Sequence, residues 1–186
     1  MTDATLLSPL IGPVAMGVAL TAAAIDAQQR RIPNWLTLGA WLVALPLQIA
    51  MHGIGEGALV WACGWLTGFA IFLPFYLLRG MAAGDVKLMA AVGAWLGASM
   101  ALEIALATFV IGGVWALALT LQRKRMGQLR RNLQSILLTW GQVGREGGAA
   151  KPEADAAVDT SASVGSLPYG VAIAAGTLGM LFVSSV

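Results

Sequence analysis

The chain has 186 residues, of which 58% are hydrophobic and 11% are charged, and its formal net charge is +2. Soluble domains carry about 25% charged residues, so this composition excludes an ordinary water-soluble globular domain. Cys63 is the single cysteine, which excludes a disulfide framework and a Cys-x-x-Cys metal site; we expect it to be a small buried apolar side chain. With His52 as the single histidine, a histidine-based metal site is close to excluded.

Long apolar stretches follow one another along the chain. A helix needs about 20 apolar residues to cross a hydrocarbon core about 30 Å thick. The first stretch is not preceded by Lys or Arg, as an export signal would be, so we interpret it as a retained helix. We therefore predict an all-α, polytopic membrane helix bundle forming a single integral-membrane domain over residues 1–186. Its six transmembrane helices cover approximately residues 6–25, 35–51, 57–78, 85–98, 100–121 and 167–186.

The positive charges decide between six helices and a five-helix alternative that merges the fourth and fifth stretches. Ten of the eleven Lys and Arg residues lie in the first, third and fifth connections, and Lys87 lies at the start of the fourth helix, beside the third connection. Because cytoplasmic loops are enriched in Lys and Arg, these connections are expected in the cytoplasm and both termini outside it. A five-helix chain would place the basic fifth connection on the opposite side from Arg30 and Arg31, so six helices are favoured.

The long cytoplasmic connection, about residues 122–166, has two parts. Apolar residues recur at helical spacing over about 128–143, beside Arg130 and Arg131. This pattern predicts a basic amphipathic helix, either on the inner membrane face or docked on the protein. Residues 144–166 are rich in Gly, Ala, Ser, Asp and Glu, which is typical of a flexible segment.

Two acidic residues stand at helix ends beside apolar runs. Asp26 ends the first helix and Asp85 opens the fourth, and these helices run in opposite directions, so both carboxylates are expected at the same depth near the cytoplasmic face. An ionisable group at such a place indicates function. Two adjacent carboxylates can share one proton, so that one draws a proton from water while the other donates. Spacing alone leaves a structural or proton-relay role open.

The segments around both acids resemble the motifs of type IV prepilin peptidases. Residues 25–34 read Ile-Asp-Ala-Gln-Gln-Arg-Arg-Ile-Pro-Asn and are similar to the first motif, while residues 84–88 resemble the Gly-x-Gly-Asp motif of intramembrane aspartyl proteases. Residues 167–170, Leu-Pro-Tyr-Gly, resemble a third and weaker element. The first glycine of the second motif is here Ala82, whose Cβ is expected to narrow the approach of substrate.

The resemblance implies roles for particular side chains. Asp26 and Asp85 would be catalytic. Supporting or substrate-positioning roles would fall to Gly84, Lys87, Pro33 and Asn34. Proline suits the first turn of a helix, so we expect Pro33 in the first turn of the second helix. Lys87 would orient substrate or tune Asp85, or would anchor the helix at lipid headgroups.

By resemblance, the chain is expected to be an endopeptidase that cleaves the short basic leader from prepilins at the cytoplasmic face of the bacterial inner membrane. It is similar to the short, peptidase-only branch of Flp-type pilus systems, without an N-methyltransferase domain. We expect no cofactor, no metal and no nucleic-acid partner; the expected partners are a prepilin, the bilayer and, as a candidate, the pilus assembly machinery. The alternatives are a transporter or proton-relay protein using Asp26, Asp85 and Lys87, and a non-catalytic assembly component.

Overall fold

The computed structural model describes residues 4–78, 80–122 and 169–185. The expected amphipathic helix over about 128–143 and the flexible segment 144–166 lie outside the described residues. The contacts below fall within one compact unit, residues 1–113 and 168–186; of the other unit, residues 114–167, the structure describes the end of α5.

The described residues form α-helices at the expected places, and the expectation of an all-α fold is confirmed. The helices are α1 (Ala4–Gln29), α2 (Asn34–His52), α3 (Ile54–Leu77), α4 (Ala83–Leu96), α5 (Ala98–Gln122) and α7 (Tyr169–Ser185). Four candidate membrane spans are long and apolar enough to cross a bilayer: Leu10–Gln29, Asn34–His52, Ile54–Leu77 and Ala98–Ala118. α4 and α7 are shorter, with 14 and 17 residues.

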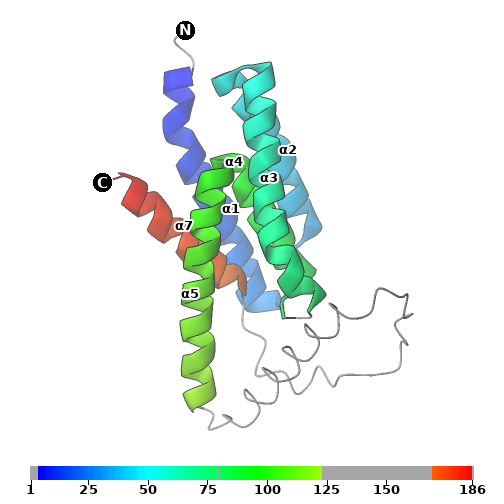
Figure 1. The fold of residues 1–186 in the computed structure, drawn as a ribbon, viewed down its shortest axis with the longest axis vertical. Helices are drawn as coiled ribbons and strands as arrows, with labels where there is room; N and C mark the ends of the chain where they lie inside the picture. The colour runs from blue at the N-terminus through cyan, green and yellow to red at the C-terminus, as the bar shows by residue number, and fades with distance from the viewer. Residues whose placement is uncertain (1–3, 79, 123–168, 186) are drawn as a thin grey trace, which may run out of the picture. The chain divides into compact units, whose positions relative to one another are not determined.

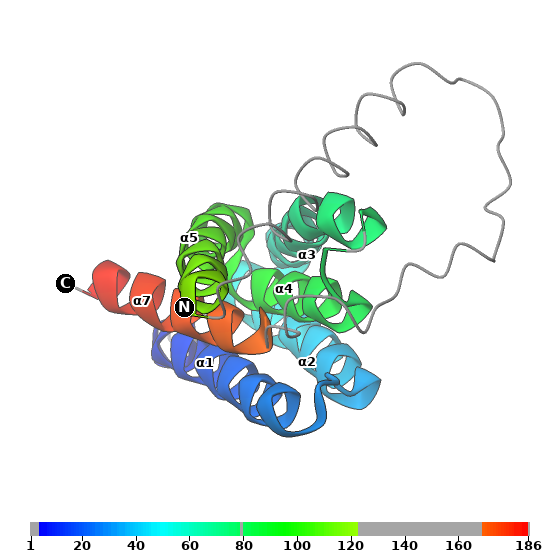
Figure 2. The same cartoon turned by 90° about the horizontal axis from the view of Figure 1, so that it is seen from below.

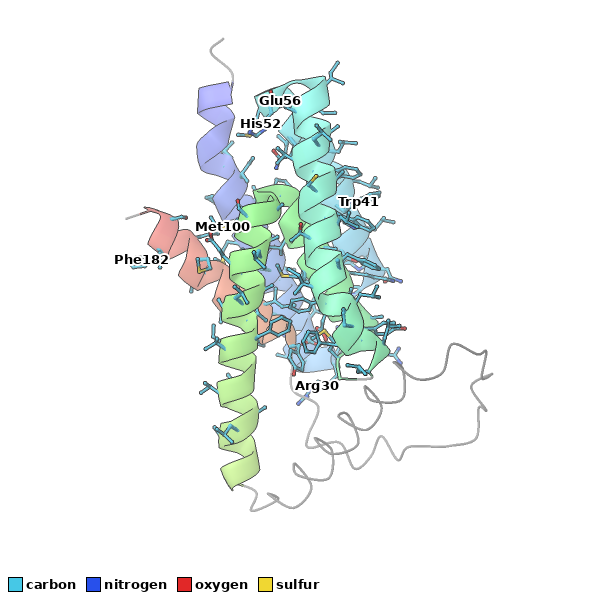
Figure 3. All side chains as sticks on the ribbon, in the orientation of Figure 1. Arg30, Trp41, His52, Glu56, Met100 and Phe182 are labelled. Carbon is cyan, nitrogen blue, oxygen red and sulfur yellow. The ribbon has the colours of Figure 1, made fainter. Side chains whose placement is uncertain are left out.

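The two ends of the helical unit carry different connections. Figure 3 shows Arg30, after α1, at the lower end, and His52, the last residue of α2, and Glu56, in the first turn of α3, at the opposite end. Consecutive helices therefore reverse direction. Both acid-bearing segments, the end of α1 and the start of α4, consequently lie at the Arg30 end (Figure 1).

The short helix α4 is the centre of the unit. It packs against α1, α2, α3 and α7, and Figure 2 shows it between α2 and α3 and beside α7. Ten of its residues are buried, among them Leu88, Met89, Val92 and Trp95. The other helices turn large apolar side chains outward, such as Leu42, Leu66 and Val110, as lipid-facing helices do.

Small residues allow α3 and α4 to lie in backbone contact. A Cβ added at Gly68 would overlap the carbonyl oxygen of Met89, and one added at Gly64 would overlap that of Gly93. Where apolar burial does not drive association, such close packing holds helices together. Cys63, beside Gly64, is exposed, so the expectation that it is buried was wrong. The outer face of a membrane helix is as apolar as its inner face. The apolar residues around Cys63 therefore did not reveal which face it lies on.

The far end of α4 is held by side chains from α2. The Gln48 amide nitrogen donates to the carbonyls of Ala94 and Trp95 at 3.2 and 2.7 Å. The indole N–H of Trp95 donates in return to the Ala40 carbonyl at 2.9 Å. The last carbonyls of a helix have no partner within it, so these bonds satisfy groups that lipid could not. They fix the position of α4 along the axis of the helical unit, and therefore also the position of its first turn.

Candidate active site

Asp26 lies in the last turn of α1 and is 7% exposed. Its Oδ2 accepts the backbone N–H of Gly170, in the first turn of α7, at 3.0 Å. The helix continues to Arg30, whose N–H donates to the Asp26 carbonyl at 2.8 Å and whose φ is +54°. A left-handed residue at this place ends the helix, as glycine commonly does. The charge of Arg30 also acts on Asp26. The carboxylate is thus buried, anchored and placed one turn from the end of α1.

Asp85 lies in the first turn of α4 and is 4% exposed. Its Oδ2 accepts the backbone N–H of Ala82 at 3.1 Å, and its own N–H donates to the Ala82 carbonyl at 3.1 Å. These bonds alone would make Asp85 a capping residue of α4. A capping carboxylate usually faces water, however, whereas this one is buried and lies within the electrostatic reach of Asp26. The two predicted carboxylates thus lie on helices that pack together, near enough for the charge of Asp26 to act on Asp85.

The first turn of α7 lies beside both acids. Gly170 contacts Asp26 so closely that an added Cβ would lie 2.9 Å from Oδ2 and 3.1 Å from Cβ of Asp26. The preceding residue, Tyr169, is half-buried and experiences the charge of Asp85. Its phenol supplies a hydrogen-bond donor that carries no charge. The sequence had indicated this segment through the weak Leu-Pro-Tyr-Gly resemblance alone, without a role for either residue.

Gly84 lets the start of α4 lie close to the segment that follows α1. A Cβ at Gly84 would lie 3.1 Å from Cβ of Ile32, which belongs to the connection between α1 and α2. The neighbouring Ala82 is exposed and has φ −80° and ψ 153°, an ordinary conformation for a residue with a Cβ. The backbone at position 82 therefore does not require the glycine that the Gly-x-Gly-Asp motif carries there.

The remaining supporting residues lie near the starts of α2 and α4. Lys87 and Asn34 are exposed, and the Lys87 Nζ donates to the Asn34 Oδ1 at 2.9 Å, which links the N-terminal parts of α4 and α2. Two positions along a helix turn through about 200°, so Lys87 leaves α4 on the face opposite Asp85. Pro33 is the N-cap of α2, not a residue of its first turn as expected, and its carbonyl accepts the N–H groups of Leu36 and Thr37 at 3.2 and 3.5 Å.

The chemistry available at the paired acids is that of two carboxylates, backbone amides and a phenol. Within residues 4–78, 80–122 and 169–185, no group of three or more His, Cys, Asp or Glu side chains could hold a metal ion. Two neighbouring buried carboxylates resist simultaneous ionisation, so a pair of this kind can share one proton. A site of this kind can remove a proton from water and deliver one to a leaving group.

Comparisons with known proteins find relatives of part of the chain. A prepilin leader peptidase/N-methyltransferase of Klebsiella pneumoniae is 36% identical over 95 residues, covering 48% of this chain and 42% of that protein. One of Dickeya chrysanthemi is 40% identical over 86 residues, covering 44% and 30%. One of Dichelobacter nodosus is 31% identical over 128 residues, covering 62% and 44%. The chain thus spans less than half the length of these relatives, and no solved structure matches it.

A comparison with protein families matches residues 14–117, more than half of the chain, to the type IV leader peptidase family. The matched segment contains Asp26, Asp85 and the whole of α2, α3 and α4. The chain belongs to the type IV leader peptidase family.

Proposed function

We propose that the chain is a membrane aspartyl endopeptidase that removes the leader from prepilins, with Asp26 and Asp85 as its catalytic residues. The observation that carries this proposal is a pair of buried carboxylates on the packed helices α1 and α4, 7% and 4% exposed, each held by one backbone N–H. Burial of two acids is unfavourable for folding, so two buried acids in a membrane helix bundle indicate a function. Membership of the leader peptidase family supports the proposed peptidase function.

The proposed reaction is hydrolysis by a water held between the two acids. The ionised carboxylate takes a proton from this water, whose oxygen bonds to the carbonyl carbon of the scissile peptide. The protonated carboxyl donates its proton to the carbonyl oxygen, which gives a tetrahedral diol. The other carboxyl then passes the proton it took from water to the leaving nitrogen, the first recovers its proton from a diol hydroxyl, and the carbon–nitrogen bond breaks. The products are a leader with a new carboxyl group and a pilin with a new amino group. The N–H groups of Gly170 and Ala82 would keep each carboxylate in place through the cycle.

We propose a small prepilin of the Flp type as substrate, cleaved where its basic leader meets its apolar helix. Both acids lie at the Arg30 end of the helical unit, within about one turn of the ends of α1 and α4. The positive charges of the odd connections support a cytoplasmic location for this end. We propose the bacterial inner membrane as the location and the pilus assembly machinery as a candidate partner. A cut at this depth would release the leader into the cytoplasm.

We further propose that these 186 residues cleave the leader without methylating the new amino terminus. The larger members that the sequence resembles carry paired Cys-x-x-Cys motifs with the methyltransferase, whereas Cys63 is the single cysteine here. Mass spectrometry of pilin processed with S-adenosylmethionine present should find an unmodified amino group. A product heavier by one methyl group would contradict this part of the proposal.

The test is cleavage of a co-expressed Flp-type prepilin, followed as a mobility shift, by wild type and by Asp26→Asn and Asp85→Asn. Asparagine keeps the shape of aspartate but cannot act as base or acid. The control is Glu56→Gln, an exposed acid at the opposite end of the unit. Cleavage by wild type and the control, and by neither Asp variant, supports the proposal. If wild type leaves a cognate prepilin uncut, the peptidase is refuted and the transporter and assembly alternatives return; if either Asp variant cuts, the pair is wrong.

A further inference from the structure

A groove with a cavity volume of about 380 Å³ runs between α2, α3 and α4 on the side of α4 away from Asp85. Its residues change in character along its length. Three polar side chains lie at one end, and aromatic side chains follow; the residues used below are Asn34, Thr37, Lys87, Trp41, Trp65 and Phe69. A polar end joined to an apolar channel is suited to bind an amphiphilic ligand.

The polar end lies at the depth of lipid headgroups. Asn34 begins the candidate span Asn34–His52, and the Lys87 ammonium donates to its side-chain oxygen at 2.9 Å. Both side chains are exposed, and among the described residues that line the groove Lys87 carries the one formal charge. The three donors of an ammonium are not all used by one asparagine oxygen. A cation at headgroup depth complements a phosphate.

The apolar part reaches into the hydrocarbon layer. Trp41 lies seven residues beyond Asn34, which is about 10 Å along the helix. The rings of Trp41 and Trp65 are 6.2 Å apart, and those of Trp65 and Phe69 are stacked at 5.2 Å. The indole N–H of Trp41 is buried and finds no acceptor in the described structure. The three rings supply an apolar wall that an acyl chain can follow.

The size and place of the groove favour a lipid over the substrate. A helix with its side chains is about 10 Å wide. An acyl chain is thinner and follows such a channel. The groove also opens on the face of α4 opposite Asp85, so a peptide lying in it would not lead to the two acids. We propose that the groove binds one anionic phospholipid, with its phosphate on Lys87 and an acyl chain along Trp41, Trp65 and Phe69.

The test is native mass spectrometry of the purified full chain titrated with phosphatidylglycerol or phosphatidylcholine. A single favourable cation–headgroup contact is worth ~1 kcal/mol, so wild type should hold one phosphatidylglycerol about fivefold more tightly. Lys87→Gln should abolish this preference, whereas Arg31→Gln, an exposed cation at the same end outside the groove, should keep it.

A second pair of variants tests the apolar part of the groove. Leu38→Trp, which fills the groove, should weaken the binding of both lipids. Leu42→Trp, equally exposed on α2 but outside the groove, should not weaken it.

The proposal does not depend on peptidase activity, since the readout is bound lipid. Equal retention of the two lipids by wild type would overturn it, as would a preference that survives Lys87→Gln. Leu38→Trp and Leu42→Trp behaving alike would show that the bound lipid lies elsewhere. Displacement of phosphatidylglycerol by the apolar peptide of a prepilin would assign the groove to the substrate instead.

Discussion

Replacing Gly170 by alanine should disturb Asp26 without unfolding the protein. The added Cβ would lie 2.9 Å from Oδ2, 3.1 Å from Cβ and 3.3 Å from Cγ of Asp26. Relaxed contacts of a methyl group lie at about 3.5–4.0 Å, so the carboxylate must move by roughly 0.5–1 Å. The N–H of residue 170 remains, which isolates the steric effect from the loss of the hydrogen bond at 3.0 Å.

The expected magnitudes differ for stability and for activity. Alanine in place of a helical glycine stabilises by up to ~1 kcal/mol, and overpacking costs about 1–3 kcal/mol, so the net change in stability should stay within ~2 kcal/mol. A misplacement of about 1 Å in a catalytic group lowers the rate by ~100-fold. We therefore expect a folded protein that cleaves prepilin about 100-fold more slowly.

The assay is the initial rate of prepilin cleavage by purified, reconstituted protein, with the melting temperature measured in parallel. The control is Gly179→Ala on the same helix, where nothing lies within 4 Å of an added Cβ. This control should cleave within about twofold of wild type, since alanine there meets open space. If Gly170→Ala cleaves at the wild-type rate, α7 does not hold Asp26 in the reactive arrangement and the reasoning is refuted.

Three further substitutions test the framework around the acids. Gln48→Met removes both hydrogen bonds to the end of α4 and should lower the melting temperature by roughly 2–10 °C; an unchanged melting curve would show that α4 is held otherwise. Ala82→Gly should leave the cleavage rate within about threefold, since the backbone there suits any residue; a large gain would restore a role for the glycine. Gly64→Ala, which drives a methyl into the Gly93 carbonyl, should abolish folded protein in a size-exclusion assay, whereas Gly55→Ala in open space on the same helix should not; a folded Gly64→Ala would disprove the close packing.

The helix positions and the two acids could be predicted because their signals are local. Long apolar stretches fix where membrane helices form, and the charged connections separate them. Asp26 and Asp85 stood out because acids beside apolar runs are rare in such a chain. Their meeting followed from helix direction alone, since the ends of α1 and α4 must lie at the same side of the unit.

Features that depend on the direction in which a side chain or backbone group points could not be predicted in the same way. The N–H that holds Asp26 belongs to the backbone of Gly170, and a backbone donor leaves no mark in the sequence. Cys63 was misplaced because both faces of a membrane helix are apolar. The helical period would have separated Lys87 from Asp85, since two positions turn a side chain to the opposite face, and the structure places Lys87 with Asn34.

The central claim is that Asp26 and Asp85 act as one catalytic unit. Its most direct test is the rate of leader cleavage in liposomes by Asp26→Asn, Asp85→Asn and the double variant, each checked for folding. Groups that act as a unit are non-additive, so each single variant should lose at least ~1,000-fold and the double variant should be no slower than either. Two partial losses that multiply in the double variant would show that the carboxylates act independently and would contradict the account.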